Sequence, residues 1–273
     1  MRLPARALSS AAPAAAPGIL LPGSGIFFWW QAGATTALAR RYDLGRAQFA
    51  GASGGALAAT LAATGCDCRK AFDVAWGLCD EARVFERGAW GLYGVWGGIV
   101  EAWLEELLPP DAHVQCNGRV NIVLRRPLRR PMAVSEFSSR ADLIGACLAS
   151  THIPFFMDRR FSRRFRGQRY VDSEFLPSIP RGAHRAALAL PQREAPYVRL
   201  AVGRDARVRK QASGLGASMR MISRDGLVQM MDWGEQHVRE LDEAGGLSAL
   251  GPLGLGSFDD GLGRDADPRT EPL

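Results

Sequence analysis

The most informative part of the sequence is Ala47-Gln48-Phe49-Ala50-Gly51-Ala52-Ser53-Gly54-Gly55, a short apolar run that continues into the pattern G-x-S-x-G. The run predicts a buried strand, and the Ala- and Leu-rich segment 54–63, which stops before Gly65, predicts a helix. A sharp turn between strand and helix lifts a serine hydroxyl clear of the backbone, and glycines beside it leave room for neighbouring elements. The pattern therefore indicates Ser53 as a nucleophile, with a glycine-rich structural turn as the alternative.

A second strand–turn–helix unit precedes this one along the chain. Ile19-Leu20-Leu21 predicts a buried strand that stops at Pro22, and residues 26–41 carry apolar side chains at helical spacing. Two such units in succession predict an α/β layered domain. The amides of Gly23-Ser24-Gly25 stand at the head of that helix, where they could receive an oxyanion. A dinucleotide-binding loop is the rival interpretation, with Asp43 as the ribose acid, but Phe28 stands where its third glycine belongs.

The remaining segments fit one domain over residues 18–244. We expect mainly helix over 66–110, strands over 120–124, 132–136 and 197–202, a helix that begins near 138–142 and a final helix over 226–241. Residues 245–273, rich in Gly, Asp and Pro, predict a flexible tail. Residues 1–17 predict a flexible extension or an organelle-targeting segment. Proline and glycine interrupt the uncharged stretch 7–39, so we expect no membrane-spanning helix.

The composition is that of a globular protein. Hydrophobic residues make up 47% and charged residues 23% of the 273, which excludes collagen, a coiled coil and a disordered chain. The formal net charge is +6 and nearly every basic residue is arginine, which indicates either a coding bias or an anionic partner. The five cysteines are scattered, so we expect reduced thiols in an intracellular protein and no zinc site.

A serine nucleophile needs a base, and two kinds of candidate are present. None of the histidines at 113, 152, 184 and 237 stands in a strong local motif, so each is more simply a surface or core residue. The segment Gln168-Arg169-Tyr170-Val171-Asp172-Ser173 predicts a short strand that ends in an acid. Asp172 is then either a base that acts directly on Ser53 or an ordinary turn residue.

Several motifs in order carry a resemblance to a known family: Gly23–Ile26, Gly51–Gly55, Val134–Ile144, Ala149–Phe155 and Phe165–Asp172. Together they resemble the patatin-like phospholipases, and within them the adipose triglyceride lipase-like branch, over roughly residues 18–240. The resemblance implies a three-layer α/β/α fold with a central, mostly parallel sheet. It also implies a lipid acyl hydrolase that cleaves fatty-acyl esters of triacylglycerol, phospholipid or galactolipid, without a metal or organic cofactor.

The resemblance assigns roles to particular residues. Ser53 would attack the ester carbonyl and form an acyl-enzyme, and Asp172 would take the hydroxyl proton and later activate water. The loop Gly23, Ser24, Gly25 and Ile26 would supply oxyanion donors, and Gly51, Gly54 and Gly55 would shape the turn at the nucleophile. His152 would fall at a packing position. The protein would act at a membrane or lipid-droplet surface, in the cytoplasm or in an organelle addressed by residues 1–17.

The sequence departs from the family at two places. The family has glycine after the catalytic Asp, where this chain has Ser173 and Glu174, and glycine again where it has Phe28. A catalytically weak or inactive protein that binds lipid or a partner is therefore the alternative. Asp225-Gly226 supplies a D-G pair but opens a helix instead of ending a strand. Acyl transfer to an alcohol is a third possibility, because it uses the same residues as hydrolysis.

Arginine residues form two clusters. The first contains Arg125, Arg126, Arg129 and Arg130. The second contains Arg159, Arg160, Arg163, Arg164 and Arg166, with Phe161 and Phe165 between them. They predict docking on anionic lipid, since each basic residue near such a surface contributes about 1 kcal/mol. The alternative is a solvated loop. RNA binding is disfavoured because no RNA-binding module accompanies the clusters.

Overall fold

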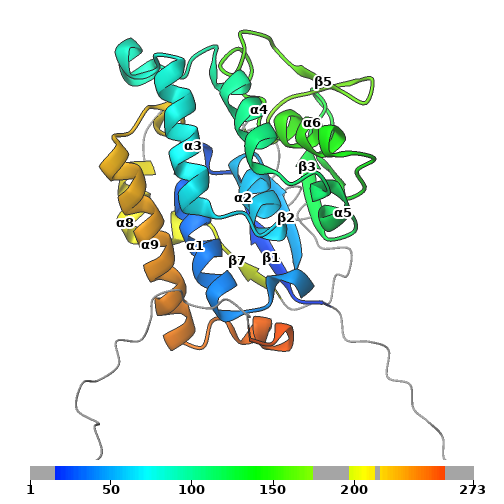
Figure 1. Ribbon diagram of the computed structural model, residues 1–273, viewed down its shortest axis with the longest axis vertical. Helices are drawn as coiled ribbons and strands as arrows, with labels where there is room; N and C mark the ends of the chain where they lie inside the picture. The colour runs from blue at the N-terminus through cyan, green and yellow to red at the C-terminus, as the bar shows by residue number, and fades with distance from the viewer. Residues whose placement is uncertain (1–15, 175–196, 213–215, 256–273) are drawn as a thin grey trace, which may run out of the picture.

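A five-stranded sheet forms the centre of the computed structural model, which describes residues 16–174, 197–212 and 216–255 (Figure 1). The strands lie in the order β4 (Met132–Val134), β3 (Val120–Leu124), β2 (Gln48–Ala52), β1 (Gly18–Leu21) and β7 (Tyr197–Arg199). Strands β3, β2, β1 and β7 are parallel, and β4 joins β3 antiparallel at the edge. The mostly parallel sheet confirms the α/β fold predicted from the sequence.

The three central strands, β1, β2 and β3, are short, mostly apolar and largely buried on both faces, as parallel strands covered by helices must be. All five residues of β3 are buried, and so are four of the five in β2. In the parallel register Leu21 pairs with Gly51, and Gly51 pairs with Ile122. The carboxyl ends of β1, β2 and β3 therefore meet at one edge of the sheet, which is where ligand sites form in such folds.

Helices surround the sheet, and their bounds follow the sequence pattern closely. They are α1 (Phe28–Arg41), α2 (Gly54–Ala63), α3 (Cys68–Glu81), α4 (Trp96–Leu107), α5 (Ala112–Cys116), α6 (Arg140–Ser150), α8 (Ala206–Ala212) and α9 (Arg224–Glu243). Side-chain caps fix three of the starts, because Asp67, Ser139 and Ser223 each accept a hydrogen bond from an amide in the first turn that follows.

Short elements complete the described chain. Turns of 3₁₀ helix are η1 (Gly25–Phe27), η2 (Leu44–Arg46), η3 (Phe85–Trp90), η4 (Val202–Arg204), η5 (Ala217–Met219) and η6 (Ser248–Leu253). A small hairpin pairs β5 (Arg163–Phe165) with β6 (Gln168–Tyr170). Three expected strands are shorter than predicted: β4 ends at Val134, β6 at Tyr170 and β7 at Arg199.

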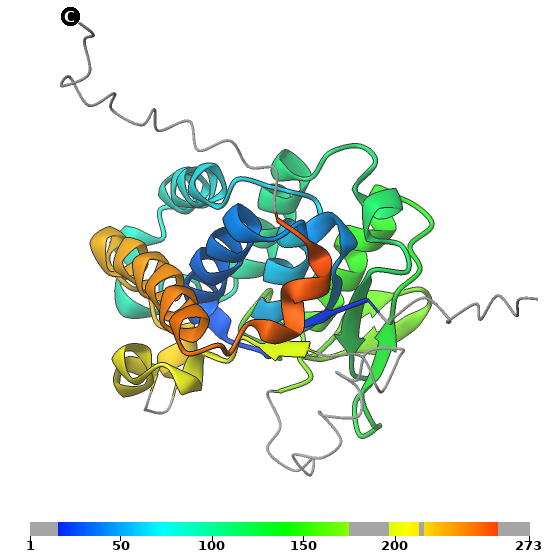
Figure 2. The ribbon, with the colours of Figure 1, turned by 90° about the horizontal axis from the view of Figure 1, so that it is seen from below.

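Helices α1 and α9 pack very closely, and in Figure 2 they lie with α3 to one side of the sheet. A Cβ atom on Gly33 would overlap the backbone of Met231, and one on Gly234 would overlap the backbone of Trp30. Glycine at both positions therefore sets how near the two helices approach. Trp30 also donates its indole N–H to the buried Asp205, at 2.8 Å, which links α1 to the start of α8.

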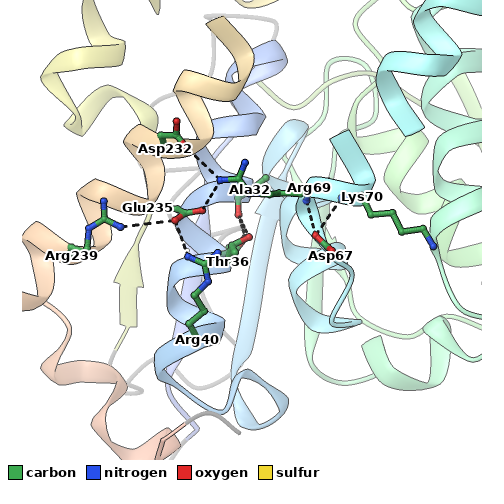
Figure 3. Close-up of polar contacts among 10 residues, drawn as sticks. Ala32, Thr36, Arg40, Asp67, Arg69, Lys70, Asp232, Glu235 and Arg239 are labelled. Carbon is green, nitrogen blue, oxygen red and sulfur yellow. Dashed lines mark hydrogen bonds and ion pairs between the residues drawn. The ribbon is translucent and has the colours of Figure 1, made fainter. Parts of the chain in front are cut away.

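Ion pairs that centre on Glu235, in the middle of α9, link this helix to α1 and α3 (Figure 3). The carboxylate oxygens of Glu235 in α9 form ion pairs with guanidinium nitrogens of Arg40 in α1 at 2.9 Å, Arg69 in α3 at 3.8 Å and Arg239 in α9 at 4.0 Å. The arginines are well exposed while the Glu235 side chain is only 10% exposed. Since exposed pairs are individually weak, the network mainly keeps this carboxylate compensated as the helices pack.

The carboxyl-terminal boundary differs from the sequence prediction. The flexible tail was expected from residue 245, yet η6 is ordered against the domain and buries Leu250 and Leu253. The prediction rested on the glycines and Pro252 of this segment. It missed that three apolar side chains at a spacing of three residues pack into the core, namely Leu247, Leu250 and Leu253. Residues 256–273 and 1–15, which include most of the two segments predicted to be flexible, lie outside the described residues.

Candidate active site

Ser53 occupies the turn between β2 and α2, in a conformation that serine rarely adopts. Its φ is 51° and its ψ is −129°, so the residue stores backbone strain. Two buried hydrogen bonds hold it there: the Ser53 N–H donates to Ser150 Oγ at 2.9 Å, and that hydroxyl donates to the carbonyl of Val123 at 2.8 Å. The strained serine is thus tied to both α6 and β3, at the carboxyl edge of the sheet.

The glycines around Ser53 are required by close backbone approach. A Cβ on Gly51 would overlap the carbonyl of Gly55, and a Cβ on Gly55 would overlap the carbonyl of Leu21 at the end of β1. A Cβ on Gly54 would lie 2.7 Å from Ser24 Oγ and 3.1 Å from the carbonyl oxygen of Gly25. The three glycines of the turn therefore let α2 start directly against the loop that follows β1.

That loop, Gly23 to Ile26, is fixed by Gln31 from the first turns of α1. Ser24 Oγ donates to Gln31 Oε1 at 2.8 Å, and Gln31 Nε2 donates to the carbonyls of Pro22 at 2.8 Å and Leu200 at 3.1 Å. Gly25 has a φ of 55°, in the left-handed region that favours glycine. The loop lies beside the nucleophile, since a Cβ on Gly23 would come within 3.2 Å of Ser53 Cβ.

Asp172 follows the small hairpin and is buried in the same region. Its N–H donates to the carbonyl of His152 at 2.7 Å, and its Oδ1 accepts the N–H of Glu174 at 2.8 Å. The neighbouring Arg125 is also buried; burial lowers the pKa of its guanidinium, and the charge of Asp172 opposes that shift. Arg125 was grouped with an exposed basic cluster on the sequence pattern, and this placement was wrong, because β3 carries it inward beside Asp172.

His152 supports Asp172 through its backbone. Its side chain is buried, with Nε2 3.1 Å from the carbonyl of Arg160, and burial lowers the pKa of the imidazole. This matches the packing role that the family resemblance implied. His237 packs its ring against Trp30, 5.1 Å between centroids, and His184 lies outside the described residues.

Glu174 makes a contact that the sequence did not predict. Its Oε1 accepts the N–H of Gly23 at 2.9 Å, so the Glu174 carboxylate sits on the loop beside Ser53, and burial raises the pKa of this group. Ser173, between the two acids, is fully buried. The two residues that depart from the family pattern thus have different surroundings: one is enclosed by protein, and the other touches a candidate oxyanion donor.

Two cavities meet at Ser53. An apolar chamber extends between α1, α3 and α4 and is lined mainly by aromatic and aliphatic side chains, among them Phe28, Trp29, Phe72, Trp76, Trp96 and Trp103. A more polar cleft is lined by Gly23, Ser24, Asp172 and Glu174. Ser53, Gly25 and Ile153 line both. The structure therefore brings Ser53, Asp172 and the glycine loop to one place.

Phe28, the second departure from the family pattern, belongs to the wall of the chamber. Its ring packs against Trp29 at 4.4 Å and edge-on against Trp103 at 5.5 Å between centroids. Trp103 is itself held by a hydrogen bond from its indole N–H to the carbonyl of Ala71, at 2.7 Å. Trp76, Trp96 and Trp103, which the sequence analysis placed only within a mainly helical segment, thus line the chamber as well.

The described residues include free thiols but neither a metal-binding cluster nor a membrane-spanning helix. Over 16–174, 197–212 and 216–255, no three His, Cys, Asp or Glu side chains are grouped so as to hold a metal ion. The five cysteines are free thiols, and burial raises the pKa of Cys147 to about 12. In the described part of the chain no helix combines the length and the hydropathy needed to cross a bilayer.

Comparison with known proteins identifies the family. The family model described as patatin-like phospholipase matches residues 19–183, which is more than half of the chain. The chain therefore belongs to the patatin-like phospholipase family, as the ordered motifs predicted.

Several relatives carry names that describe lipid chemistry. The chain is 30% identical over 162 residues to the 1-acylglycerol-3-phosphate O-acyltransferase Pnpla3 of Mus musculus, covering 58% of this chain and 39% of the relative. It is 29% identical over 167 residues to the omega-hydroxyceramide transacylase of the same species, 59% of this chain and 28% of the relative. It is 29% identical over 134 residues to the human patatin-like phospholipase domain-containing protein 4, 48% of this chain and 53% of the relative. The matched part spans about half or less of each of these relatives.

Proposed function

We propose that the protein is a lipid acyl hydrolase that uses Ser53 as nucleophile and Asp172 as base. The observation that carries this proposal is the position of Ser53, at the junction of an apolar chamber and a polar cleft that also contains Asp172. A lipid ester matches this arrangement, because its apolar acyl chain and its more polar alcohol part are joined at the carbonyl that the nucleophile attacks. Membership of the patatin-like phospholipase family supports this chemistry.

The proposed reaction has two halves. Ser53 Oγ attacks the ester carbonyl carbon while Asp172 takes the hydroxyl proton, and backbone N–H groups of the loop Gly23–Ile26 receive the negative oxygen. Collapse of this intermediate breaks the carbon–oxygen bond, and the alcohol leaves with the proton. Water then attacks the acyl-enzyme with Asp172 again as base, which releases the fatty acid and restores Ser53. The positive end of α2 at Ser53 favours the charge that develops in both halves.

The chamber is suited to an acyl chain, and the cleft to the rest of the lipid. Its walls come from α1, α3, α4 and the loop after α6, and they are almost entirely apolar. Triacylglycerol, phospholipid and galactolipid all present such a chain. The protein would meet them at the surface of a membrane or lipid droplet.

Acyl transfer is a second candidate reaction. Two of the relatives are named as an acyltransferase and a transacylase. The first half of the reaction is unchanged, and an acceptor hydroxyl replaces water in the second. Product analysis with and without an added lipid alcohol separates the two reactions, since only transfer yields a new ester.

A weak or inactive site is the third candidate, and the contact between Glu174 and Gly23 favours it. An ester oxygen that needs the Gly23 N–H must displace a carboxylate that already occupies it. Ser173, in place of the family's glycine, changes the backbone freedom of the turn that carries Asp172.

Labelling with a fluorophosphonate probe, followed by mapping of the modified peptide, tests the proposal. We expect the label on Ser53, its loss in Ser53→Ala and a much slower reaction in Asp172→Asn. Ser248→Ala, which removes an exposed hydroxyl from η6, is the matched control and should label normally. Absence of label on folded protein, in solution and with lipid vesicles, would reject the hydrolase and leave the inactive lipid-binding alternative.

A further inference from the structure

Four large aromatic side chains are exposed in two pairs, one in contact with the buried ring of Phe156 and the other including the next residue in sequence, Phe155. Trp90, Tyr93, Phe155 and Phe161 are 45%, 45%, 53% and 50% exposed. The rings of Trp90 and Tyr93 contact the ring of Phe156, at 6.4 and 6.0 Å between centroids. Phe155, the next residue to Phe156, pairs with Phe161 at 5.8 Å. Single exposed apolar residues are ordinary, but a group of this kind marks an interaction surface. We call these four residues the aromatic rim.

The aromatic rim adjoins residues that line the apolar chamber. Phe156 also contacts Trp96, at 5.7 Å between centroids, and Trp96 lines the chamber. Ile153 and Met157, on either side of Phe155 in sequence, line it as well. One short loop after α6 therefore presents some side chains to the chamber and others to solvent.

Backbone strain keeps Phe155 exposed. Its φ is 64°, a conformation that is unfavourable for a bulky side chain. The loop is closed by two hydrogen bonds, from the Phe155 N–H to the carbonyl of Arg160 at 2.8 Å and from the Arg159 N–H to the carbonyl of Phe155 at 3.0 Å. The exposed rings are thus presented by a fixed loop, which lowers the entropy lost when they insert into another phase.

Cationic side chains surround the aromatic rim. Arg159, Arg160 and Arg220 are exposed, and Arg220 stacks over the ring of Trp90 at 5.6 Å. Among the described residues none of these three guanidinium groups has a carboxylate at ion-pair distance. Aromatic rings prefer the boundary between headgroups and acyl chains, and arginine prefers anionic headgroups. This combination matches an anionic lipid surface.

Other members of the two arginine clusters do not contribute to this face. Arg163 pairs with Glu101, and Arg166 pairs with Asp142. Phe165 is buried rather than exposed, because β5 turns it toward α6, where Gly145 leaves room for its ring. Arg126, Arg129, Arg130 and Arg164 are exposed on other segments, so Arg159, Arg160 and Phe161 are the cluster members that lie in the loop after α6.

We propose that the aromatic rim, with Arg159, Arg160 and Arg220, is the face by which the protein docks on an anionic phospholipid surface. Docking there sets the rim side of the chamber against the lipid, so that an acyl chain reaches Ser53 without crossing water. The entry of substrate rests on the proposed function, whereas docking itself needs no turnover.

Flotation with vesicles tests the docking face in the full chain. The Ser53→Ala protein is mixed with vesicles of phosphatidylcholine alone or of phosphatidylcholine with phosphatidylserine, at low and high salt. We expect binding to the mixed vesicles that weakens at high salt. In the same background, Tyr93→Ser with Phe161→Ser should lower binding by about tenfold, because two aromatic rings no longer leave water. Arg160→Gln should lower it by about fivefold, and only on the anionic vesicles.

Matched controls lie at the opposite edge of the sheet. Tyr197 is 56% exposed but pairs with Gly18 at the amino end of β1, and Arg239 is exposed near the carboxyl end of α9. Tyr197→Ser and Arg239→Gln should leave vesicle binding unchanged. Equal losses in the controls and in the rim variants would overturn the proposal, as would equal binding to neutral and anionic vesicles. A dimer in gel filtration that dissociates in the rim variants, without vesicle binding, would overturn it in favour of a self-association surface.

A soluble ester separates this proposal from the proposed function. With Ser53 intact, the rim variants should hydrolyse p-nitrophenyl butyrate as the wild type does and lose activity only on vesicles. Rim-dependent vesicle binding in a protein without any esterase activity would support docking while the hydrolase proposal fails. Esterase activity together with vesicle binding that does not change in the rim variants would support the hydrolase proposal and overturn the docking face.

Discussion

The two halves of the candidate site are built under different constraints. On the nucleophile side, Gly51 and Gly55 touch backbone that cannot move, and Ser53 is tied down by two buried hydrogen bonds. On the base side, Glu174 lines the polar cleft and reaches the Gly23 N–H through its side chain. Backbone contact with a buried sheet therefore fixes residue identity, whereas a turn whose contact is made by a flexible side chain admits substitutions that alter chemistry without preventing folding.

The most damaging change should be Gly55→Ala. The new Cβ would overlap the carbonyl of Leu21, so β1 and α2 must separate, at a cost of at least about 3 kcal/mol. Thermal unfolding would show a melting temperature lower by roughly 10 °C. Gly77→Ala is the matched control, because this helical glycine has open space around it and alanine should stabilise by about 0.5–1 kcal/mol. Equal melting temperatures for the two variants would contradict the rigid description of the nucleophile side.

Asp172→Asn should remove activity and leave the fold intact. Without a base of sufficient strength, turnover of a soluble ester should fall by about 10²- to 10⁴-fold. The control is Asp111→Asn, an exposed acid on the amino side of α5, which should retain full turnover. A variant of Asp172 that keeps most of the activity would show that the base side plays no part in catalysis.

Ser150→Ala should destabilise the turn that carries Ser53, because Ser150 holds the backbone of this turn. It leaves the buried N–H of Ser53 and the carbonyl of Val123 without their shared partner, which costs about 1–3 kcal/mol. We expect a lower melting temperature and a lower kcat on soluble ester. Ser162→Ala, also a buried serine but with only a long contact from Arg169, should change both much less. Indistinguishable effects would mean that Ser150 does not hold the strained turn.

Glu174→Ala should have the smallest effect of these changes, and it should raise activity instead of lowering it. Freeing the Gly23 N–H removes a hydrogen bond worth about 0.5–1.5 kcal/mol, so kcat/KM on soluble ester should rise about two- to tenfold. Glu174→Gln keeps an acceptor at the same place and should rise less. Ser173→Gly, alone and combined with Glu174→Ala, shows whether the turn itself is also misaligned. Lower activity in Glu174→Ala would instead make the carboxylate a useful part of the site.

The fold was predictable from the sequence where local patterns decide it. Helix α2 and strand β3 begin and end at the predicted residues, because apolar runs bounded by glycine or polar residues specify them locally. The ordered motifs also predicted the family. The prediction failed at η6, where composition indicated a flexible tail and distant packing partners produced an ordered turn.

The candidate site was predictable only in part. Ser53, Asp172 and the Gly23–Ile26 loop could be named because each lies in a recognisable motif. Gln31, Ser150 and Arg125 could not, since each is an ordinary polar residue until its distant partner is known: Leu200, Ser53 and Asp172 in turn. A buried polar residue within an apolar helix, as Gln31 is, was the one available signal.

Local patterns in the sequence were enough to predict the parallel α/β fold, the sharp turn at Ser53 and the family, because backbone geometry over a few residues follows from near neighbours. Tertiary structure alone decided the chamber, the aromatic rim and the contact between Glu174 and Gly23, residues that are 151 positions apart. Cavities and surfaces arise from the packing of elements that are far apart in the sequence, and no local pattern in the chain specifies how such elements pack.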